Sequence, residues 1–157
     1  FAFPFGTHVA VVEIDIETGG VELINYIGVD DCGIQVNPLI VEGQVHGGIV
    51  QGAAQALFEE AVYDEDGTIT NPSLMDYLVP STMEMPNITL DSTVTPSTTN
   101  PLGVKGVGEA GTIGSAAAVI NAVCDALSPY GVTDIKMPAT PQRIWNAINA
   151  GSNGGAA

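Results

Sequence analysis

The chain has 157 residues, of which 45% are hydrophobic and 13% are charged. This composition predicts a folded chain of about one domain, not a disordered one, despite 19 glycines and 10 prolines. Eighteen acidic residues against three lysines and arginines give a formal net charge of −15. Such a surface repels phosphate backbones, which argues against nucleic-acid binding. We expect no transmembrane segment, and two cysteines in unlike contexts predict a reducing, cytoplasmic location.

The N-terminal third of the sequence predicts a β-hairpin followed by a helix. Two β-branched runs, 8–16 and 21–29, are joined by Glu17-Thr18-Gly19-Gly20, which supplies residues typical of a tight turn. After a loop, apolar residues at helical spacing predict a helix over roughly 42–61.

This predicted helix carries an unusual polar and glycine-rich stripe. Gln44 and Gln51 lie seven positions apart, with Gly47, Gly48 and Gly52 beside them. An interior helical glycine costs about 1 kcal/mol relative to alanine. We therefore expect some group to approach the backbone of this helix closely.

The remaining elements are signalled by turns, caps and periodicity. Residues 63–68 are typical of a hairpin turn, and the alternating apolar residues in 88–94 indicate an edge strand or an extended crossing. A helix is expected over 116–127, capped by Thr112 or Ser115, followed by a short strand at 132–137. Thr140-Pro141 then opens a helix through Ala150.

These elements predict an α+β fold with mixed strands and hairpins and about three helices. We expect one structural unit over residues 1–150 and a flexible tail over 151–157, where glycine and alanine dominate.

A glycine-rich stretch before the helix at 116–127 admits more than one interpretation. Gly106, Gly108 and Gly111 satisfy the pattern G-x-G-x-x-G, which is typical of a dinucleotide-binding loop. Such a site needs an apolar strand directly before the glycines, but residues 95–101 contain two prolines and no periodicity. A nucleotide-binding module remains one alternative, and a non-catalytic assembly domain whose glycines serve helix packing is another.

Glu109 lies inside this stretch, close in sequence to Lys105. An isolated glutamate at this position would interact favourably with the helix dipole. The surrounding glycines favour a second role, because small neighbours would let a ligand reach the carboxylate. Partial burial would raise the pKa of Glu109 toward that of a useful general base.

Taken together, several blocks resemble the molybdenum hydroxylases, the xanthine dehydrogenase and aldehyde oxidase family. The likeness is strongest to the molybdenum-binding large subunits of the aerobic carbon-monoxide-dehydrogenase type. The blocks that carry it are Val29-Asp30-Asp31-Cys32-Gly33, Asn37-Pro38, Glu42-Gly43-Gln44-Val45-His46-Gly47-Gly48, Gln51-Gly52 and Asn100-Pro101-Leu102-Gly103-Val104-Lys105-Gly106-Val107-Gly108-Glu109-Ala110-Gly111-Thr112.

The resemblance implies roles for individual residues. Glu109 matches the family's active-site glutamate, the base that takes a proton from a molybdenum-bound hydroxide or water. Gln44 matches a glutamine that contacts the molybdopterin cofactor. Other matching positions are a wall on the cofactor side of the glutamate and a loop against the pterin or its nucleotide: Lys105, Gly106, Val107 and Gly108 for the wall, and Asp31, Cys32 and Asn37 for the loop.

The resemblance also implies cofactors and partners. The chain matches only the C-terminal part of a large subunit, so we expect it to work as one piece of a heteromeric, duplicated assembly and to be inactive alone. The cofactor would be molybdopterin as its cytosine dinucleotide, carrying molybdenum that no protein side chain ligates. The 2Fe-2S and FAD centres would lie on partner chains. Carbon monoxide, aldehydes and N-heterocycles all remain open as substrates.

Overall fold

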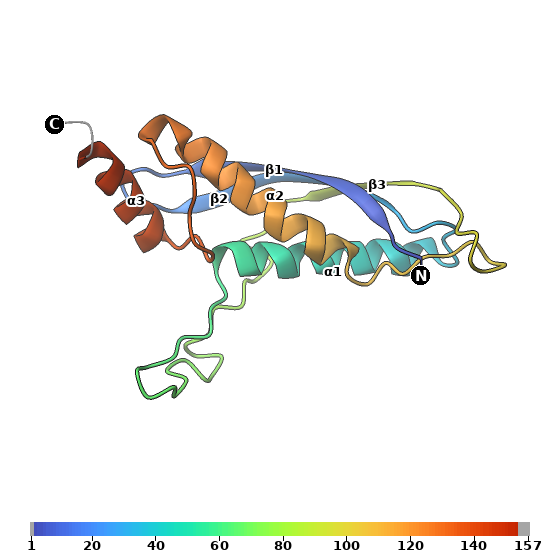
Figure 1. The fold of residues 1–157 in the computed structure, drawn as a ribbon, viewed down its shortest axis with the longest axis horizontal. Coiled ribbons are helices and arrows are strands. Elements are labelled where there is room, and N and C mark those ends of the chain that lie inside the picture. Colours follow the sequence, from blue (N-terminus) through green and yellow to red (C-terminus); the bar gives the residue numbers. More distant parts are fainter. Residues whose placement is uncertain (1, 154–157) are drawn as a thin grey trace.

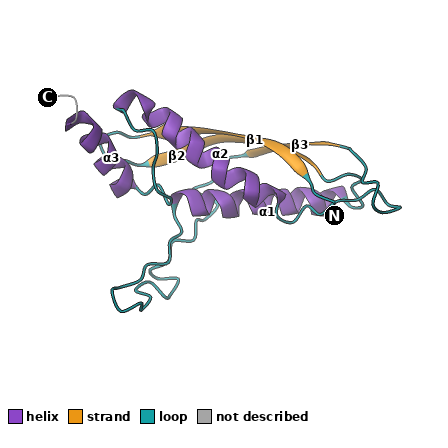
Figure 2. Ribbon diagram, viewed as in Figure 1, coloured by secondary structure: helices purple, strands orange, loops and turns teal. Residues whose placement is uncertain are grey.

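The computed structural model describes residues 2–153 and consists of a three-stranded sheet with helices on one face (Figures 1 and 2). The α+β class predicted from the sequence is confirmed. In chain order the elements are β1 (Phe5–Ile14), β2 (Val21–Asp31), α1 (Pro38–Leu57), β3 (Ile88–Thr93), α2 (Ala110–Leu127), the short 3₁₀ helix η1 (Ser128–Tyr130) and α3 (Pro141–Asn153).

The sheet has the order β1-β2-β3. The predicted hairpin is confirmed, because β1 and β2 pair antiparallel from Phe5↔Asp31 to Ile14↔Val21. Its turn is closed by a hydrogen bond from the Asp15 amide to the Gly20 carbonyl at 2.9 Å. β3 is the expected edge strand and runs parallel to β2, with Gly28 opposite Leu90. The loop that leaves the end of β2 therefore starts beside the loop that leaves the end of β3.

The core lies between the sheet and the helices. One face of the sheet is buried against α1 and α2, while Val9, Val11 and Ile27 on the other face are exposed. α1 and α2 lie against each other along their length, and α2 also packs on β1. The buried residues that form this core are Leu23, Tyr26, Val45, Ile49, Ala53, Ala56, Leu57, Val119, Val123, Leu127, Val132, Ile135, Ala139, Ile144 and Ile148.

The segment Ala110–Tyr130 is long and apolar enough, by length and composition, to cross a membrane, with a mean hydropathy of 1.4. Our expectation from the sequence overlooked this run. In the structure its apolar face packs inward, with Val119, Val123 and Leu127 buried in the core. The high hydropathy is thus accounted for in part by packing on α1 and β1.

Helix boundaries depend on capping details that periodicity alone misses. α1 begins at Pro38 and not at residue 42, because the Asn37 side chain accepts a hydrogen bond from the Ile40 amide and proline occupies the first turn. α2 begins at Ala110, before either predicted cap. α3 begins at Pro141 as predicted, with Thr140 accepting from the Arg143 amide.

Two predictions about the C-terminal third need correction or fall partly outside the described residues. The strand predicted over 132–137 is wrong, since this stretch forms no ladder with the sheet and instead crosses toward the end of α1. Its apolar residues Val132 and Ile135 are used for the core. α3 continues to Asn153, past the boundary expected at residue 150, and residues 154–157 lie outside the described part.

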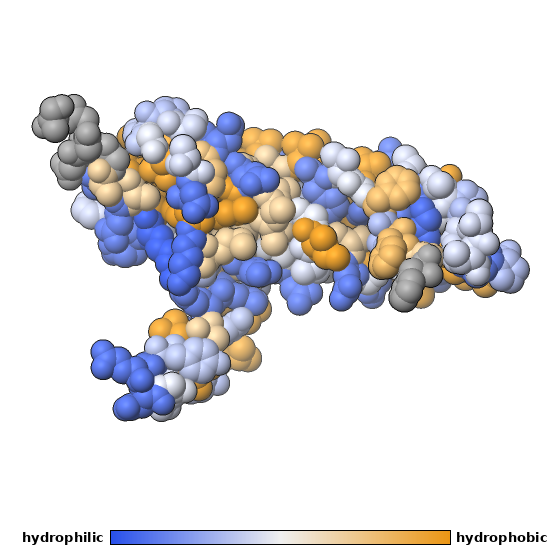
Figure 3. All heavy atoms as spheres, viewed as in Figure 1, coloured by the Kyte–Doolittle hydropathy of each residue, from blue (hydrophilic) through white to orange (hydrophobic). Residues whose placement is uncertain are grey.

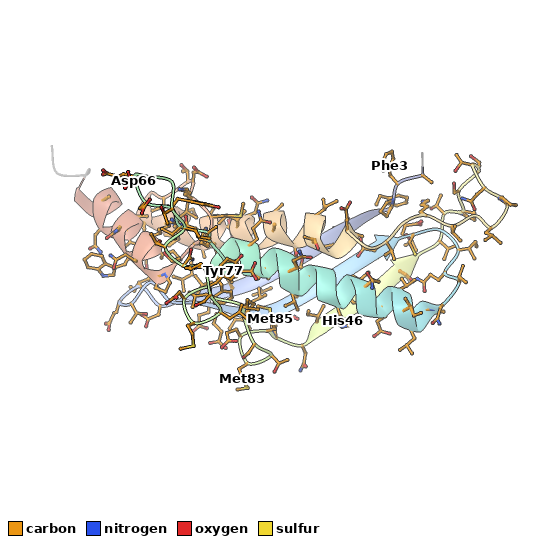
Figure 4. All side chains as sticks on the ribbon, turned by 90° about the horizontal axis from the view of Figure 1, so that it is seen from below. Phe3, His46, Asp66, Tyr77, Met83 and Met85 are labelled. Atoms are coloured by element: carbon orange, nitrogen blue, oxygen red, sulfur yellow. The ribbon has the colours of Figure 1, made fainter. Side chains whose placement is uncertain are left out.

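Residues 59–86 form an arm that projects away from the body (Figure 1). The predicted turn is confirmed within it, where Asp64 accepts from the amides of Asp66 and Thr68. Hydrophobic and hydrophilic residues lie side by side on its surface (Figure 3). Tyr77 and Met83, labelled in Figure 4, belong to the arm, and Tyr77 donates a hydrogen bond to Glu59, the first residue of the arm, at 3.0 Å.

Candidate functional site

The glycines of α1 divide into two groups, and the first group lies in the contact with α2. A Cβ on Gly48 would lie 2.9 Å from the Thr112 nitrogen, and a Cβ on Gly52 would lie 2.6 Å from the Thr112 carbonyl oxygen. On the opposite helix, a Cβ on Gly111 would lie 2.5 Å from the Val45 carbonyl oxygen. We call these three glycines the seam. The sequence predicted that some group approaches the α1 backbone closely. At Gly48 and Gly52 that group is helix α2.

The second group of glycines faces open space. A Cβ on Gly43, Gly47 or Gly106 would meet nothing within 4 Å. Gly108 lies near this strip, since a Cβ there would be 3.8 Å from the Gln44 side-chain oxygen. We call the exposed strip formed by Gly43, Gln44, Gly47, Gly106, Gly108 and Glu109 the glycine rim. It presents bare backbone, one amide and one carboxylate to the outside of the chain.

Glu109 lies at the N-cap of α2 without capping it. Its side chain makes no cap hydrogen bond, and its backbone carbonyl accepts from the Ile113 amide at 3.0 Å. The side chain is exposed, so the partial burial expected from the sequence is absent within this chain. The carboxylate is therefore available to a group that approaches the rim from outside.

Lys105 does not face the rim with its ammonium group. Its Nζ atom lies 2.9 Å from Asp31 Oδ1, with the two side chains only 7% and 0% exposed. The same ammonium lies 4.5 Å from the centre of the Phe5 ring, a cation–π contact. The Lys105 side chain thus fixes the start of the loop that carries Glu109.

The Asp31 carboxylate has a complete set of donors. Burial opposes its ionisation, but hydrogen bonds from Lys105, the Gly33 amide, Thr95 and Thr93 outweigh that effect and hold the pKa of Asp31 below its usual value. We call the Asp31–Lys105 ion pair the latch. The carboxylate is used inside the fold and is not free to contact a cofactor.

Backbone hydrogen bonds join the loop after β2 to the loop before α2. The Lys105 amide donates to the Cys32 carbonyl at 2.8 Å, and the Ile34 amide donates to the Gly103 carbonyl at 3.0 Å. The Cys32 side chain is buried, and burial raises the pKa of its thiol. A buried thiol with a raised pKa packs as a small apolar group and is a poor nucleophile.

The structure brings two of the predicted loop residues and two of the predicted wall residues together around one cavity. Cys32, Asn37, Lys105 and Val107 line a largely apolar cavity of about 300 Å³ between the two joined loops. Asn37, which caps α1, is part of its lining. Gln44, Gly106, Gly108 and Glu109 belong to the adjacent rim.

His46, on α1 beside the rim, contacts its own helix (Figure 4): its Nδ1 atom lies 3.0 Å from the Glu42 carbonyl oxygen. Among residues 2–153, no group of three or more His, Cys, Asp or Glu side chains is arranged to hold a metal ion.

A buried polar network beneath α2, centred on His8, was not identified from the sequence. His8 Nδ1 lies 2.7 Å from the Tyr26 hydroxyl, and His8 Nε2 lies 3.1 Å from Asp30 Oδ2. Burial, and then the charge of Asp30, raises the pKa of Tyr26. The only sequence feature that reflects this network is a glycine inside α2, Gly114, which leaves room for the His8 ring.

The dinucleotide-binding alternative does not fit this geometry. A Rossmann loop joins a strand to a helix, but before Gly106 the chain forms only an isolated bridge between Val104 and Gly33. Gly111, the last glycine of the pattern, lies in the seam. The assembly alternative accounts for the seam but not for the open glycines of the rim.

Comparison with known proteins gives a consistent result. Residues 1–86 match the family described as the molybdopterin cofactor-binding domain. The carbon monoxide dehydrogenase large chain of Hydrogenophaga pseudoflava is 41% identical over 148 residues, and the nicotine 6-hydroxylase large subunit of Paenarthrobacter nicotinovorans is 44% identical over 145 residues. The crystal structure of quinoline 2-oxidoreductase from Pseudomonas putida 86 superposes with a TM-score of 0.89 at 44% identity.

The matched region is a small part of each relative. The alignments cover 94% and 92% of this chain but 18% of each of the two relatives, and the structural match covers 92% of this chain and 18% of the other. The chain therefore spans less than a fifth of the length of these proteins.

Proposed function

Because this chain belongs to the molybdopterin cofactor-binding domain family, we propose that it forms part of the molybdenum-binding subunit of an oxidoreductase, with Glu109 as general base. The observation that carries the proposal is the glycine rim. Backbone at Gly43, Gly47 and Gly106 faces open space, and a Cβ on Gly108, the residue before the exposed Glu109, would lie 3.8 Å from the Gln44 side-chain oxygen.

The rim fits a large polar cofactor. A Cβ on any of the three open glycines would fill space that such a group could occupy. The Gln44 side chain supplies both a donor and an acceptor for a polar heterocycle. When bound, the molybdenum cofactor would supply the redox chemistry that no side chain of this chain can perform.

The protein groups would bind, orient and move a proton. Gln44 and the backbone of Gly106 and Gly108 would contact the cofactor, and Val107, with the cavity beside it, would exclude water from one side. The Glu109 carboxylate, held at the start of α2 without a hydrogen bond to its own helix, would take a proton from the water that attacks the substrate carbon. The latch would hold this loop in register.

The enclosure that Glu109 lacks here would come from elsewhere in the complete enzyme. The chain covers 18% of the relatives' length, so other parts of the subunit would close the face opposite the rim. That closure would bring the carboxylate out of bulk water. The proposal includes the cytosine dinucleotide form of the cofactor, 2Fe-2S and FAD on partner chains, a duplicated assembly and a cytoplasmic location, all supported by the family resemblance alone.

The substrate is left open in this proposal. The relatives named for carbon monoxide and for nicotine are 41% and 44% identical to this chain, so overall identity does not separate their substrates.

The test is Glu109→Gln in the assembled enzyme. The amide keeps the size of the side chain but cannot take a proton, and general-base catalysis is worth about 10²–10⁴-fold. We expect kcat to fall by that factor while the molybdenum content, measured by mass spectrometry of the metal, stays at the wild-type level. Turnover that survives with full molybdenum would refute the assignment of Glu109.

A further inference from the structure

A buried histidine supports α2 from below, close to where Glu109 begins the helix. The His8 ring is fixed at both nitrogen atoms, by Tyr26 at 2.7 Å and by Asp30 at 3.1 Å. Its side chain is 3% exposed and that of Asp30 is 8% exposed. Contacts at both ring nitrogen atoms restrict rotation of the imidazole. The ring therefore has a single well-defined position.

The contact between this ring and α2 is close. A Cβ on Gly114 would lie 2.7 Å from His8 Nδ1, so α2 approaches the ring without an intervening side chain. Three residues earlier on the same helix, the seam holds Gly111 against α1. The first turns of α2 thus contact both His8 on β1 and the backbone of α1.

Asp30 and Asp31 are consecutive in β2, so their side chains point to opposite faces of the sheet. Asp31 holds Lys105 at the start of the Glu109 loop, and Asp30 holds His8 under the helix at the end of that loop. The two carboxylates therefore fix the loop at both ends.

We propose that His8, oriented by Asp30, is a positioning residue for Glu109. This inference rests on the proposed function, because it assigns His8 to the same site. His8 would act through Gly114 and the first turns of α2, without contact with substrate or cofactor. A displacement of about 1 Å at a reacting group can cost on the order of 100-fold in rate.

The test uses His8→Ala and His8→Gln in the assembled enzyme. Alanine removes the support under Gly114, whereas glutamine keeps a donor that can reach Asp30. We expect His8→Ala to speed amide hydrogen exchange in peptides covering 104–115 and to lower kcat by roughly 10–100-fold at unchanged KM. His8→Gln should recover part of both losses, and it supplies the measurement if the alanine variant does not assemble.

The matched control is Val9→Ala, which truncates the next residue of β1 on the exposed face of the sheet; its exchange over 104–115 should remain at the wild-type rate. Unchanged exchange over 104–115 in both His8 variants would overturn the inference, as would faster exchange spread equally through α3. Glu109→Gln, measured in parallel, separates the two claims. If that variant keeps its turnover, the proposed function fails, and the exchange rates alone then decide whether His8 positions the loop.

Discussion

The seam and the rim use the same residue type on the same helix for opposite reasons. At Gly48 and Gly52, helix α2 comes so close that a Cβ would collide with its backbone. At Gly43 and Gly47, a Cβ would meet nothing within 4 Å. The seam glycines are explained by the fold of this chain, and the rim glycines are not. Glycines that lower helix stability without a packing reason point to a ligand.

The largest loss of stability is expected at the latch, because this ion pair holds the loop part of the rim to the body of the chain. Lys105→Met keeps the aliphatic length of the side chain but leaves the buried Asp31 without its cation. Loss of one partner from a buried ion pair costs about 3–5 kcal/mol. We expect the free energy of unfolding of the assembled enzyme to fall by an amount in that range, measured by denaturant titration.

Lys136→Met is the matched control, since Lys136 is exposed and surface ion pairs contribute only about 0–1 kcal/mol. If the two variants are equally stable, the latch does not hold the loop.

The latch also predicts a pH dependence. The pKa of Asp31 is lowered in the folded chain, so its contribution to stability is present above the unfolded pKa, about 3.9, and is lost as the pH falls toward the folded value. The difference in Tm between wild type and Lys105→Met should therefore be largest near neutral pH and should narrow below about pH 4. A difference that stays constant down to pH 3 would contradict this account of the pair.

Gly52→Ala tests the seam. The added Cβ would lie 2.6 Å from the Thr112 carbonyl oxygen, so α1 and α2 must separate. Overpacking of this kind costs about 1–3 kcal/mol, and we expect Tm to fall accordingly. Gly43→Ala makes the same change in open space on the same helix and should not lower Tm. Equal destabilisation by both variants would mean that the seam is not close-packed.

Much of the fold could be predicted from local patterns. The hairpin follows from two β-branched runs around a Gly-Gly turn, and the helices follow from apolar periodicity and from Thr140-Pro141. The segment 132–137 misled the prediction because its apolar residues serve the core without a strand partner. The parallel pairing of β3 with β2 depends on contacts across about 60 residues of chain, which periodicity does not encode.

For the site, the sequence identified the region but not the direction of each side chain. Gln44 on α1 and Gly108 in the loop before α2 come close, since a Cβ on Gly108 would lie 3.8 Å from the Gln44 side-chain oxygen. Lys105 was expected on the cofactor side, yet its ammonium is held by Asp31 from 74 positions away in sequence. Ion-pair partners this far apart in sequence are set by tertiary structure. The sequence alone does not show which of its many carboxylates pairs with Lys105.

The smallest effect, and the one that separates seam from rim most directly, is expected for Gly47→Ala. Gly47 lies in the interior of α1 with open space beside it, so alanine should stabilise the helix by about 1 kcal/mol. The same methyl group would occupy space that we assign to the cofactor. We therefore expect a Tm of the cofactor-free assembly that is equal to or above that of wild type, together with a lower molybdenum content after expression. A rise in Tm with full molybdenum would show that glycine is not needed at this position for cofactor access. The added methyl group would then have stabilised the helix without hindering cofactor binding.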